Sequence, residues 1–254
     1  MIQAIIKNSF LVGTFIILAN YIYAQTYVPI EVTGFTNDLI ANGSGGTNRA
    51  AATTDTTFDK AASLNDDNVM YSKDFRGNNN PNTAPPYGLP NDGIINSVNV
   101  NLVGAKYQLA PYDKKNALVL KTNGSAGILT LETPGVYSTI AFLGSSANGS
   151  SSFTVTLNFN DKTSTTNAFT VPDWYDGTGF AIKGIGRVTR TQVSTQVPDQ
   201  FSGTSENPRL YDNLITISAP YNAKILTSIT FTKTSAESFS ARFSSKLLVA
   251  SDNE

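Results

Sequence analysis

Residues 152–160 read Ser-Phe-Thr-Val-Thr-Leu-Asn-Phe-Asn, and this stretch decides the fold class. Its large apolar residues, Phe153, Val155, Leu157 and Phe159, alternate strictly with small polar ones. Successive side chains of a β-strand point to opposite faces, so the pattern predicts a strand with one buried and one wet face. Residues 225–231 behave similarly. No stretch of ten or more residues keeps a 3.6-residue period, which argues against helices.

Runs rich in β-branched and aromatic residues recur along the chain, separated by turn signals such as Asn123-Gly124 and Pro134-Gly135. We predict strands at residues 28–35, 94–103, 106–110, 117–121, 127–132, 137–144, 152–160, 165–171, 179–190, 210–218, 225–232 and 239–250. Many short strands at regular spacing predict an all-β, jelly-roll-like antiparallel β-sandwich.

Residues 25–254 are predicted to form a single β-sandwich domain, interrupted by a long polar excursion at about residues 36–92. A structureless loop of that length is uncommon inside a compact domain. We therefore expect short strands or turns within the excursion, around residues 68–72.

The first 24 residues have the anatomy of a secretory signal peptide. Lys7 is their only charged residue, residues 10–19 are nearly all apolar, and the segment ends in a small residue, Ala24. The apolar run is shorter than the ~20 residues that a membrane span needs, although a retained anchor is the alternative. The sequence thus predicts a protein that is secreted or displayed at the cell surface, with no membrane span after signal removal.

Composition excludes several function classes. The chain has no histidine and no cysteine, which removes Ser-His-Asp and Cys-His catalysis and the usual zinc, copper and haem ligand sets. Its net charge is −1, whereas a nucleic-acid partner requires clustered Lys and Arg. Carboxylate chemistry, an oxygen-ligated cation and binding without chemistry remain.

A family resemblance is carried by short segments spread over most of the chain after residue 24. They are residues 27–35 (YVPIEVTGF), 88–90 (GLP), 107–109 (YQL), 116–118 (NAL), 154–163, 171–175 (VPDWY), 184–187 (GIGR) and 207–211 (NPRLY). Together they resemble secreted bacterial jelly-roll modules of the galactose-binding-like type, which are often found ahead of C-terminal sorting domains in surface proteins. The resemblance implies a sandwich fold and a surface location, and it supplies no catalytic residue.

The candidate ligand site is the segment Asp173-Trp174-Tyr175-Asp176-Gly177, which holds the only tryptophan. Aromatic faces and carboxylates are the mixture with which proteins bind sugars, because convergent polar groups fix the orientation of the ligand. The alternative for Trp174 is plain core packing, since large aromatic side chains commonly fill cores.

Two arginines extend this candidate site. The guanidinium of Arg187 or Arg209 is suited to bind a uronate carboxylate with two hydrogen bonds, and the alternative is an ion pair with Asp173, Asp176 or Glu206.

A cation site is also predicted in the excursion, where Asp55, Asp59, Asp66 and Asp67 supply oxygen ligands suited to a structural calcium ion. A solvated loop is the alternative there. No other cofactor is predicted.

Three functions follow from these patterns. The first is a non-catalytic carbohydrate-binding module that takes a polysaccharide or glycan. The second is a structural or adhesive surface protein with protein partners. The third is a carboxylate-dependent polysaccharide hydrolase or lyase using Asp173 with Asp176 or Glu206, which requires the two carboxylates to face each other across a cleft. The sequence leaves the question of enzyme activity open and favours the first function.

Overall fold

The structure is a computed structural model, and it describes residues 27–43, 54–60, 67–76, 86–102, 104–175, 177–190, 201–236, 239–242 and 246–250. The regular secondary structure of these residues is almost all β-strand, and most strand pairs are antiparallel, which confirms the predicted all-β sandwich. The predicted signal peptide, residues 1–24, lies outside the described ranges. Within them, no helix is long and apolar enough to cross a membrane.

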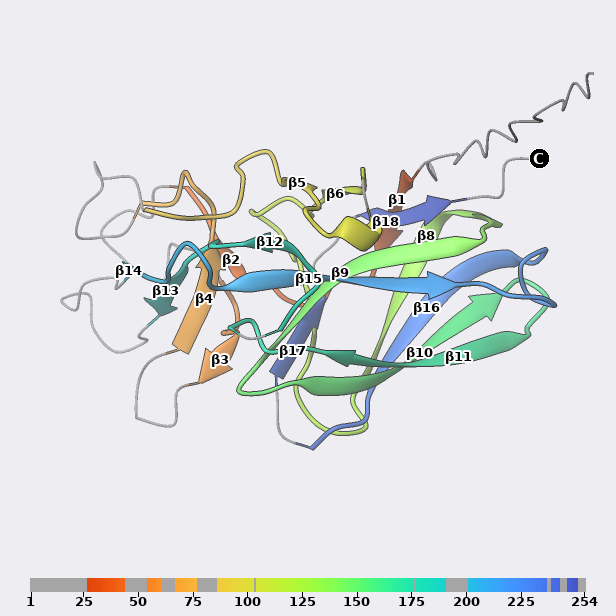
Figure 1. The fold of residues 1–254 in the computed structure, drawn as a ribbon. Helices are drawn as coiled ribbons and strands as arrows, with labels where there is room; N and C mark the ends of the chain where they lie inside the picture. Colours follow the sequence, from red (N-terminus) through yellow and green to blue (C-terminus); the bar gives the residue numbers. More distant parts are fainter. Residues whose placement is uncertain are drawn as a thin grey trace, which may run out of the picture.

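An 11-stranded antiparallel sheet curls over to form two layers (Figure 1). The outer layer contains β11 (Ser164–Val171), β10 (Ser151–Phe159), β16 (Ile225–Lys233) and β8 (Ala126–Val136). The inner layer contains β18 (Lys246–Ala250), β9 (Thr139–Ala147), β15 (Arg209–Thr216), β12 (Phe180–Lys183), β17 (Phe239–Arg242) and β7 (Leu118–Leu120). Strand β1 (Val28–Thr33) joins the layers, because it pairs with β8 and with β18.

The first hydrophobic core lies between these two layers. Strand β10 alternates buried and half-buried residues along its whole length, and apart from Ser151 the buried ones are the apolar residues that its sequence predicts. Opposite them, the ring of Phe142 on β9 meets that of Phe231 on β16 edge-on, with 5.1 Å between centroids. The alternation of polar and apolar residues in the sequence thus corresponds to a sheet with one buried face.

Strand β9 differs, because all nine of its residues are buried. Ile140 and Phe142 point into the first core, whereas Ala141, Leu143 and Ala147 point into a second core on the opposite face of the inner layer. Its sequence, TIAFLGSSA, lacks the polar alternation of an exposed strand for this reason.

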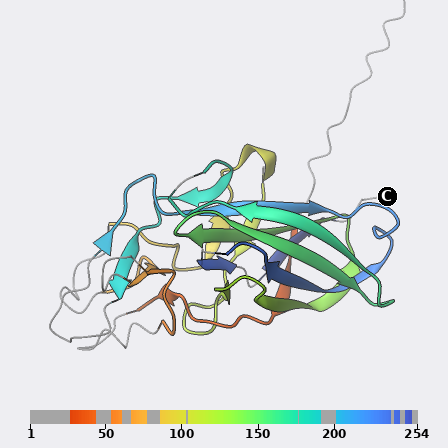
Figure 2. The same cartoon turned by 90° about the horizontal axis from the view of Figure 1, so that it is seen from below.

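The polar excursion covers the second core. It contributes β2 (Ile40–Ala41), β3 (Asp59–Lys60) and β4 (Asp67–Tyr71) to a five-stranded sheet with β13 (Arg187–Arg190) and β14 (Phe201–Ser202). Both views place this small sheet at one end of the molecule and the long strands of the curled sheet at the other (Figures 1 and 2). Strand β4 confirms the short strand expected around residues 68–72.

A buried polar pair fastens the excursion to the sheet. Asn116 donates from Nδ2 to Asp38 Oδ1 at 2.7 Å, and its Oδ1 accepts the Leu39 N–H at 2.9 Å. Both polar residues are at most 8% exposed. Burying a polar group is costly unless it is hydrogen-bonded, so the pair favours one way of docking the excursion.

Two predicted strands are broken within the described residues, and the strand predicted at residues 239–250 is described as two strands, β17 and β18. Residues 179–190 were expected to be continuous, but they form β12 and β13, separated by Gly184 and Gly186, both at φ +66°. A Cβ on Gly184 would lie 2.6 Å from the Ser205 carbonyl oxygen, so this turn depends on glycine. Residues 94–103 were expected to be one strand, but β5 (Ile94–Asn96) ends early and a 3-10 turn, η2 (Val100–Leu102), follows.

Candidate functional site

Trp174 lies in the second core. It is 1% exposed, and its ring centroid is 4.5 Å from that of Phe58 and 5.8 Å from that of Tyr175. Its backbone is also fixed, since its N–H donates to Ser146 O at 2.7 Å and its carbonyl accepts the Arg209 N–H at 2.8 Å. Of the two interpretations that the sequence left open, the structure supports core packing, and the ring offers no face to a ligand.

Arg187 covers the outer side of these aromatic rings. Its guanidinium carbon lies 4.7 Å from the Tyr175 centroid and 5.6 Å from the Trp174 centroid, and Nε donates to Ser202 Oγ at 3.0 Å. Tyr175 and Arg187 are both half-buried. Cation–π contacts of this kind are favourable when partly desolvated, so they stabilise the junction of β13 with the Trp174 turn.

The Asp173 carboxylate shapes the turn that carries Trp174. Its Oδ2 accepts the Gly149 N–H at 2.6 Å, and its Oδ1 accepts the Tyr175 N–H at 2.9 Å. The Asp173 carbonyl accepts the Tyr211 hydroxyl at 2.6 Å. The two backbone N–H bonds to the carboxylate therefore stabilise the conformation of this turn. Asp176 lies outside the described residues.

Arg209, Glu206 and Lys183 form a charged group beside this turn. Lys183 Nζ lies 2.6 Å from Glu206 Oε1, and Arg209 Nη2 lies 4.0 Å from Glu206 Oε2. The hydrogen bond from Lys183 holds the pKa of Glu206 below its ordinary value. Arg209 also donates to Gly177 O at 2.5 Å and to Glu206 O at 2.9 Å. The guanidinium thus serves local structure, as the ion-pair interpretation proposed.

The predicted calcium ligands are placed only in part. Asp55 Oδ1 accepts hydrogen bonds from Asn37 Nδ2 at 2.9 Å and from the Asp38 N–H at 3.1 Å, which ties two parts of the excursion together. Asp66 and the side chains of Asp59 and Asp67 lie outside the described part of the chain. Among the side chains that are described, no three acidic residues gather into a cation site.

A partly buried carboxylate that sequence reasoning missed, that of Asp212, lies on β15. Asp212 Oδ2 accepts the Ser97 hydroxyl at 2.8 Å, while Asp212 Oδ1 and the Tyr107 hydroxyl are buried without a hydrogen-bond partner in the described structure. Burial raises the pKa of Asp212, and the nearby hydroxyls of Tyr107 and Ser97 act in the opposite direction. Burial likewise raises the pKa of Tyr107. The carboxylate is therefore held at a cost to stability near neutral pH.

Asp212→Asn should stabilise the protein at pH 7 by on the order of 1 kcal/mol, because the amide removes a desolvated charge and can donate to the Tyr107 hydroxyl. A carboxyl whose pKa is raised by folding binds its proton more tightly in the folded state. Its contribution is therefore fully present below the unfolded pKa, about 3.9, and is lost as pH rises through the folded pKa. The advantage of Asp212→Asn in thermal unfolding should thus be largest at pH 7–8 and shrink towards about pH 4. An advantage independent of pH would contradict this explanation.

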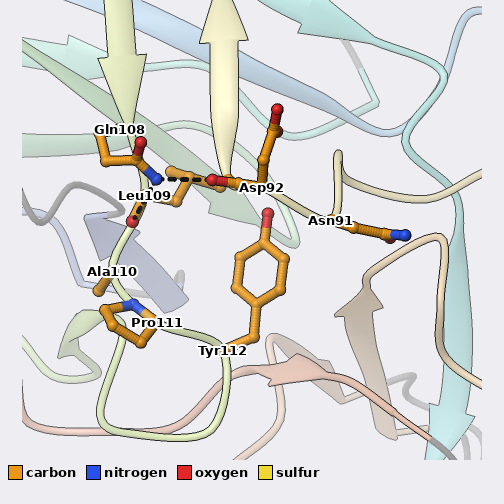
Figure 3. A pocket seen from close by; sticks show the side chains of 8 residues that line it. Asn91, Asp92, Gln108, Leu109, Ala110, Pro111 and Tyr112 are labelled. Atoms are coloured by element: carbon orange, nitrogen blue, oxygen red, sulfur yellow. Dashed lines mark hydrogen bonds between the residues drawn. The ribbon is translucent and has the colours of Figure 1, made fainter.

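The described structure also contains a shallow pocket that the sequence did not reveal. It lies where the turn at residues 90–93 enters β5, beside the chain that leaves β6 (Lys106–Gln108), and its volume is about 180 Å³ (Figure 3). The lining residues are Asn91, Asp92, Gly93, Gln108, Leu109, Ala110, Pro111 and Tyr112. We call it the hairpin pocket, because the antiparallel pair β5–β6 brings its two halves together.

Gln108 and Gly93 set the shape of the hairpin pocket. Gln108 Nε2 donates to Asp92 O at 2.8 Å and to Leu109 O at 3.3 Å, so the amide is fixed across the hairpin. Gly93 has φ +68°, and a Cβ there would lie 2.8 Å from Gln108 Nε2. Only glycine gives this turn without displacing the amide.

Asp92 and Tyr112 supply the other polar features. Asp92 Oδ1 accepts the Ile94 N–H at 3.0 Å, which orients the exposed carboxylate, and no hydrogen bond within the described structure engages its other oxygen. The Tyr112 ring is 8% exposed, its hydroxyl donates to Pro90 O at 2.7 Å, and burial raises its pKa. Figure 3 shows this hydroxyl directed towards Asp92 and the Asn91 side chain directed away.

The sequence matches no known protein-family model and no curated protein. The signal that could have identified the hairpin pocket is the turn sequence Pro90-Asn91-Asp92-Gly93, which alone predicts a turn and not a site.

Proposed function

We propose that this chain is an exported, non-catalytic carbohydrate-binding module and that the hairpin pocket holds a sugar residue of a glycan. The observation that carries the proposal is the lining of the pocket, where an oriented carboxylate, a fixed amide and the apolar surface of Pro111 and Tyr112 surround one hollow. A few placed polar groups on an apolar wall are the usual composition of a small-molecule site.

The size and charge of the hairpin pocket favour a single sugar ring. At about 180 Å³ it is smaller than the ~300–1,000 Å³ of sites for drug-sized ligands. The Asp92 carboxylate is a strong acceptor for hydroxyl groups and would repel an anionic ligand such as a uronate. A neutral sugar at a chain end or branch is the ligand class that fits.

Other features agree with binding without chemistry. The chain has no histidine or cysteine, and Asp173, a member of the proposed catalytic pair, is engaged by two backbone N–H groups. The apolar leader at residues 10–19 and the resemblance to secreted jelly-roll modules support export and surface display as part of the proposal.

Asp92→Asn and Gln108→Ala should each weaken binding of a neutral glycan at least tenfold. Loss of a hydrogen bond to the charged Asp92 carboxylate costs about 1.5–3 kcal/mol, and 1.4 kcal/mol corresponds to a factor of ten. Gln108→Ala removes the neutral amide that bonds to Asp92 O and Leu109 O, so the two sides of the pocket lose the bonds that hold their shape. The measurement is a screen of the purified protein against neutral and acidic polysaccharides, with calcium and with chelator, followed by titration calorimetry on each hit.

Asp113→Asn is the matched control, because it makes the same charge change at an exposed residue beyond the pocket lining. It should bind as the wild type does. A glycan that binds all three variants with unchanged affinity would place the site elsewhere. A folded protein that binds no glycan would overturn the proposal and favour an adhesive function with protein partners.

A further inference from the structure

Strand β11 ends the 11-stranded sheet and has a neighbour on one side only. It pairs with β10 from Ser164 to Val171 in a register without irregularity. Within the described structure no other strand pairs with it (Figure 1). No further backbone hydrogen bond among the described residues reaches it. An exposed edge of this kind presents a row of unpaired N–H and C=O groups.

The pairing pattern identifies which residues present these groups. The Phe159 N–H donates to Thr163 O at 3.0 Å, so residues 159 and 163 are a hydrogen-bonded pair. Hydrogen-bonded and non-hydrogen-bonded pairs alternate along an antiparallel ladder. Residues 165, 167, 169 and 171 therefore bond to β10, and the backbone groups of Ser164, Thr166, Ala168 and Thr170 point to the open side.

This edge lacks the features with which proteins usually protect edge strands. Its sequence, STTNAFTV, contains no charge and no proline, and the β10–β11 ladder has no bulge. The other end of the sheet is protected, because the Val98 N–H donates to Ala181 O on β12 at 3.0 Å. Among the described residues, one end of the sheet is thus covered and the other is open.

The outward residues that pair across the strands next to β11 are also uncharged. The paired outward residues are Ser164, Thr166, Ala168 and Thr170 on β11, Ser152, Thr154, Thr156 and Asn158 on β10, Ser228, Thr230 and Thr232 on β16, and Ala126, Ile128 and Thr130 on β8. A charged residue near a two-fold axis would meet its own copy and repel it. No charge among these paired residues opposes the approach of an identical edge, and the nearest charge on the same alternation of β8 is Glu132, beyond Thr130.

We propose that β11 is a dimerisation edge, where it pairs antiparallel with β11 of a second copy about a two-fold axis at Asn167. This register places Thr166 opposite Ala168 and Ser164 opposite Thr170 of the second copy. Those are the four residues whose backbone groups point outward, so every one of these groups finds a partner. A two-fold contact is self-complementary and closed, so the assembly ends at the dimer.

Ala168→Pro should weaken the dimer at least tenfold without unfolding the protein. Proline is tolerated at an edge position whose N–H points away from the sheet, and it removes a donor that the second copy needs. The measurement is sedimentation velocity of the purified wild type and variant over a dilution series, with circular dichroism to verify the fold.

Two charge variants test whether the dimer forms through the edge strand β11 or through the outward face of the sheet. Ala168→Lys adds a charge on β11 and should also favour the monomer, whereas Thr230→Lys adds one on the same face in the interior strand β16 and should dimerise as the wild type does. A wild type that stays monomeric at its highest soluble concentration would overturn the proposal. So would an Ala168→Pro variant that dimerises with unchanged affinity.

Cross-linking tests the register directly, because the chain has no cysteine of its own. Asn167→Cys would place two thiols in a non-hydrogen-bonded pair, where Cα atoms lie about 4.5 Å apart, within the roughly 4.4–6.8 Å that a disulfide allows. Mild oxidation should therefore give a covalent dimer. Ala168→Cys, whose partner position is Thr166, should remain largely uncross-linked. The reverse result would overturn the proposed axis.

Discussion

Trp174→Ala should destabilise the protein by about 3–5 kcal/mol, which is the usual cost of truncating a large buried aromatic residue. The ring is 1% exposed, packs against Phe58 at 4.5 Å between centroids and supports the guanidinium of Arg187. For a chain of this size the melting temperature should fall by on the order of 10 °C. Thermal unfolding followed by circular dichroism measures the effect.

Trp174→Phe is the control for this substitution, because it keeps an aromatic ring and most of the buried area. It should cost much less than the alanine variant. Trp174 is also the only tryptophan, so intrinsic fluorescence of the wild type reports on this site alone. A glycan that occupies the hairpin pocket should leave that emission nearly unchanged.

The opposite result would change the functional interpretation. If Trp174→Ala kept the wild-type melting temperature and lost glycan binding, the ring would serve as a ligand platform, as the first sequence interpretation of residues 173–177 proposed. Because the structure buries the ring, we expect instead a less stable protein whose folded fraction still binds. Stability and affinity measured on the same variant therefore decide between the two sites.

Strand positions could be predicted from the sequence because the signal is local. Residues 152–160 alternate polar and apolar side chains, and β10 spans Ser151–Phe159 with its apolar side buried. The predicted strand at residues 225–232 corresponds to β16, Ile225–Lys233. One face of each strand is exposed to solvent and the other is buried. Polar and apolar residues therefore alternate along the sequence with a period of two.

Features that depend on distant partners could not be predicted in this way. The burial of Trp174 depends on Phe58, more than a hundred positions earlier in the chain. The hairpin pocket combines the turn at residues 90–93 with residues 108–112, and neither segment by itself indicates a binding site. Asp212 is partly buried beside residues 97 and 107, and nothing in its local sequence indicates this.

Gly34→Ala should be among the most damaging single substitutions in the chain. Gly34 follows β1 at φ +116°, and a Cβ there would lie 2.1 Å from the backbone carbonyl oxygen of Ile128 on β8. Neither strand can move away cheaply, because β8 is also bonded to β16, where Thr230 pairs with Ile128. Backbone strain and overpacking each cost about 1–3 kcal/mol, so the sum should approach 3–5 kcal/mol.

Gly43→Ala is the control that separates the steric clash of a Cβ from the backbone strain of a positive φ. Gly43 also has a positive φ, +64°, but nothing lies within 4 Å of the position that a Cβ would take. This variant should lose only about 1–2 kcal/mol, the cost of a left-handed conformation for a residue with a side chain. Chemical denaturation of the two variants measures the difference. Equal losses would mean that β1 and β8 can separate at Gly34, and the junction that joins the two layers of the curled sheet would then be looser than the structure shows.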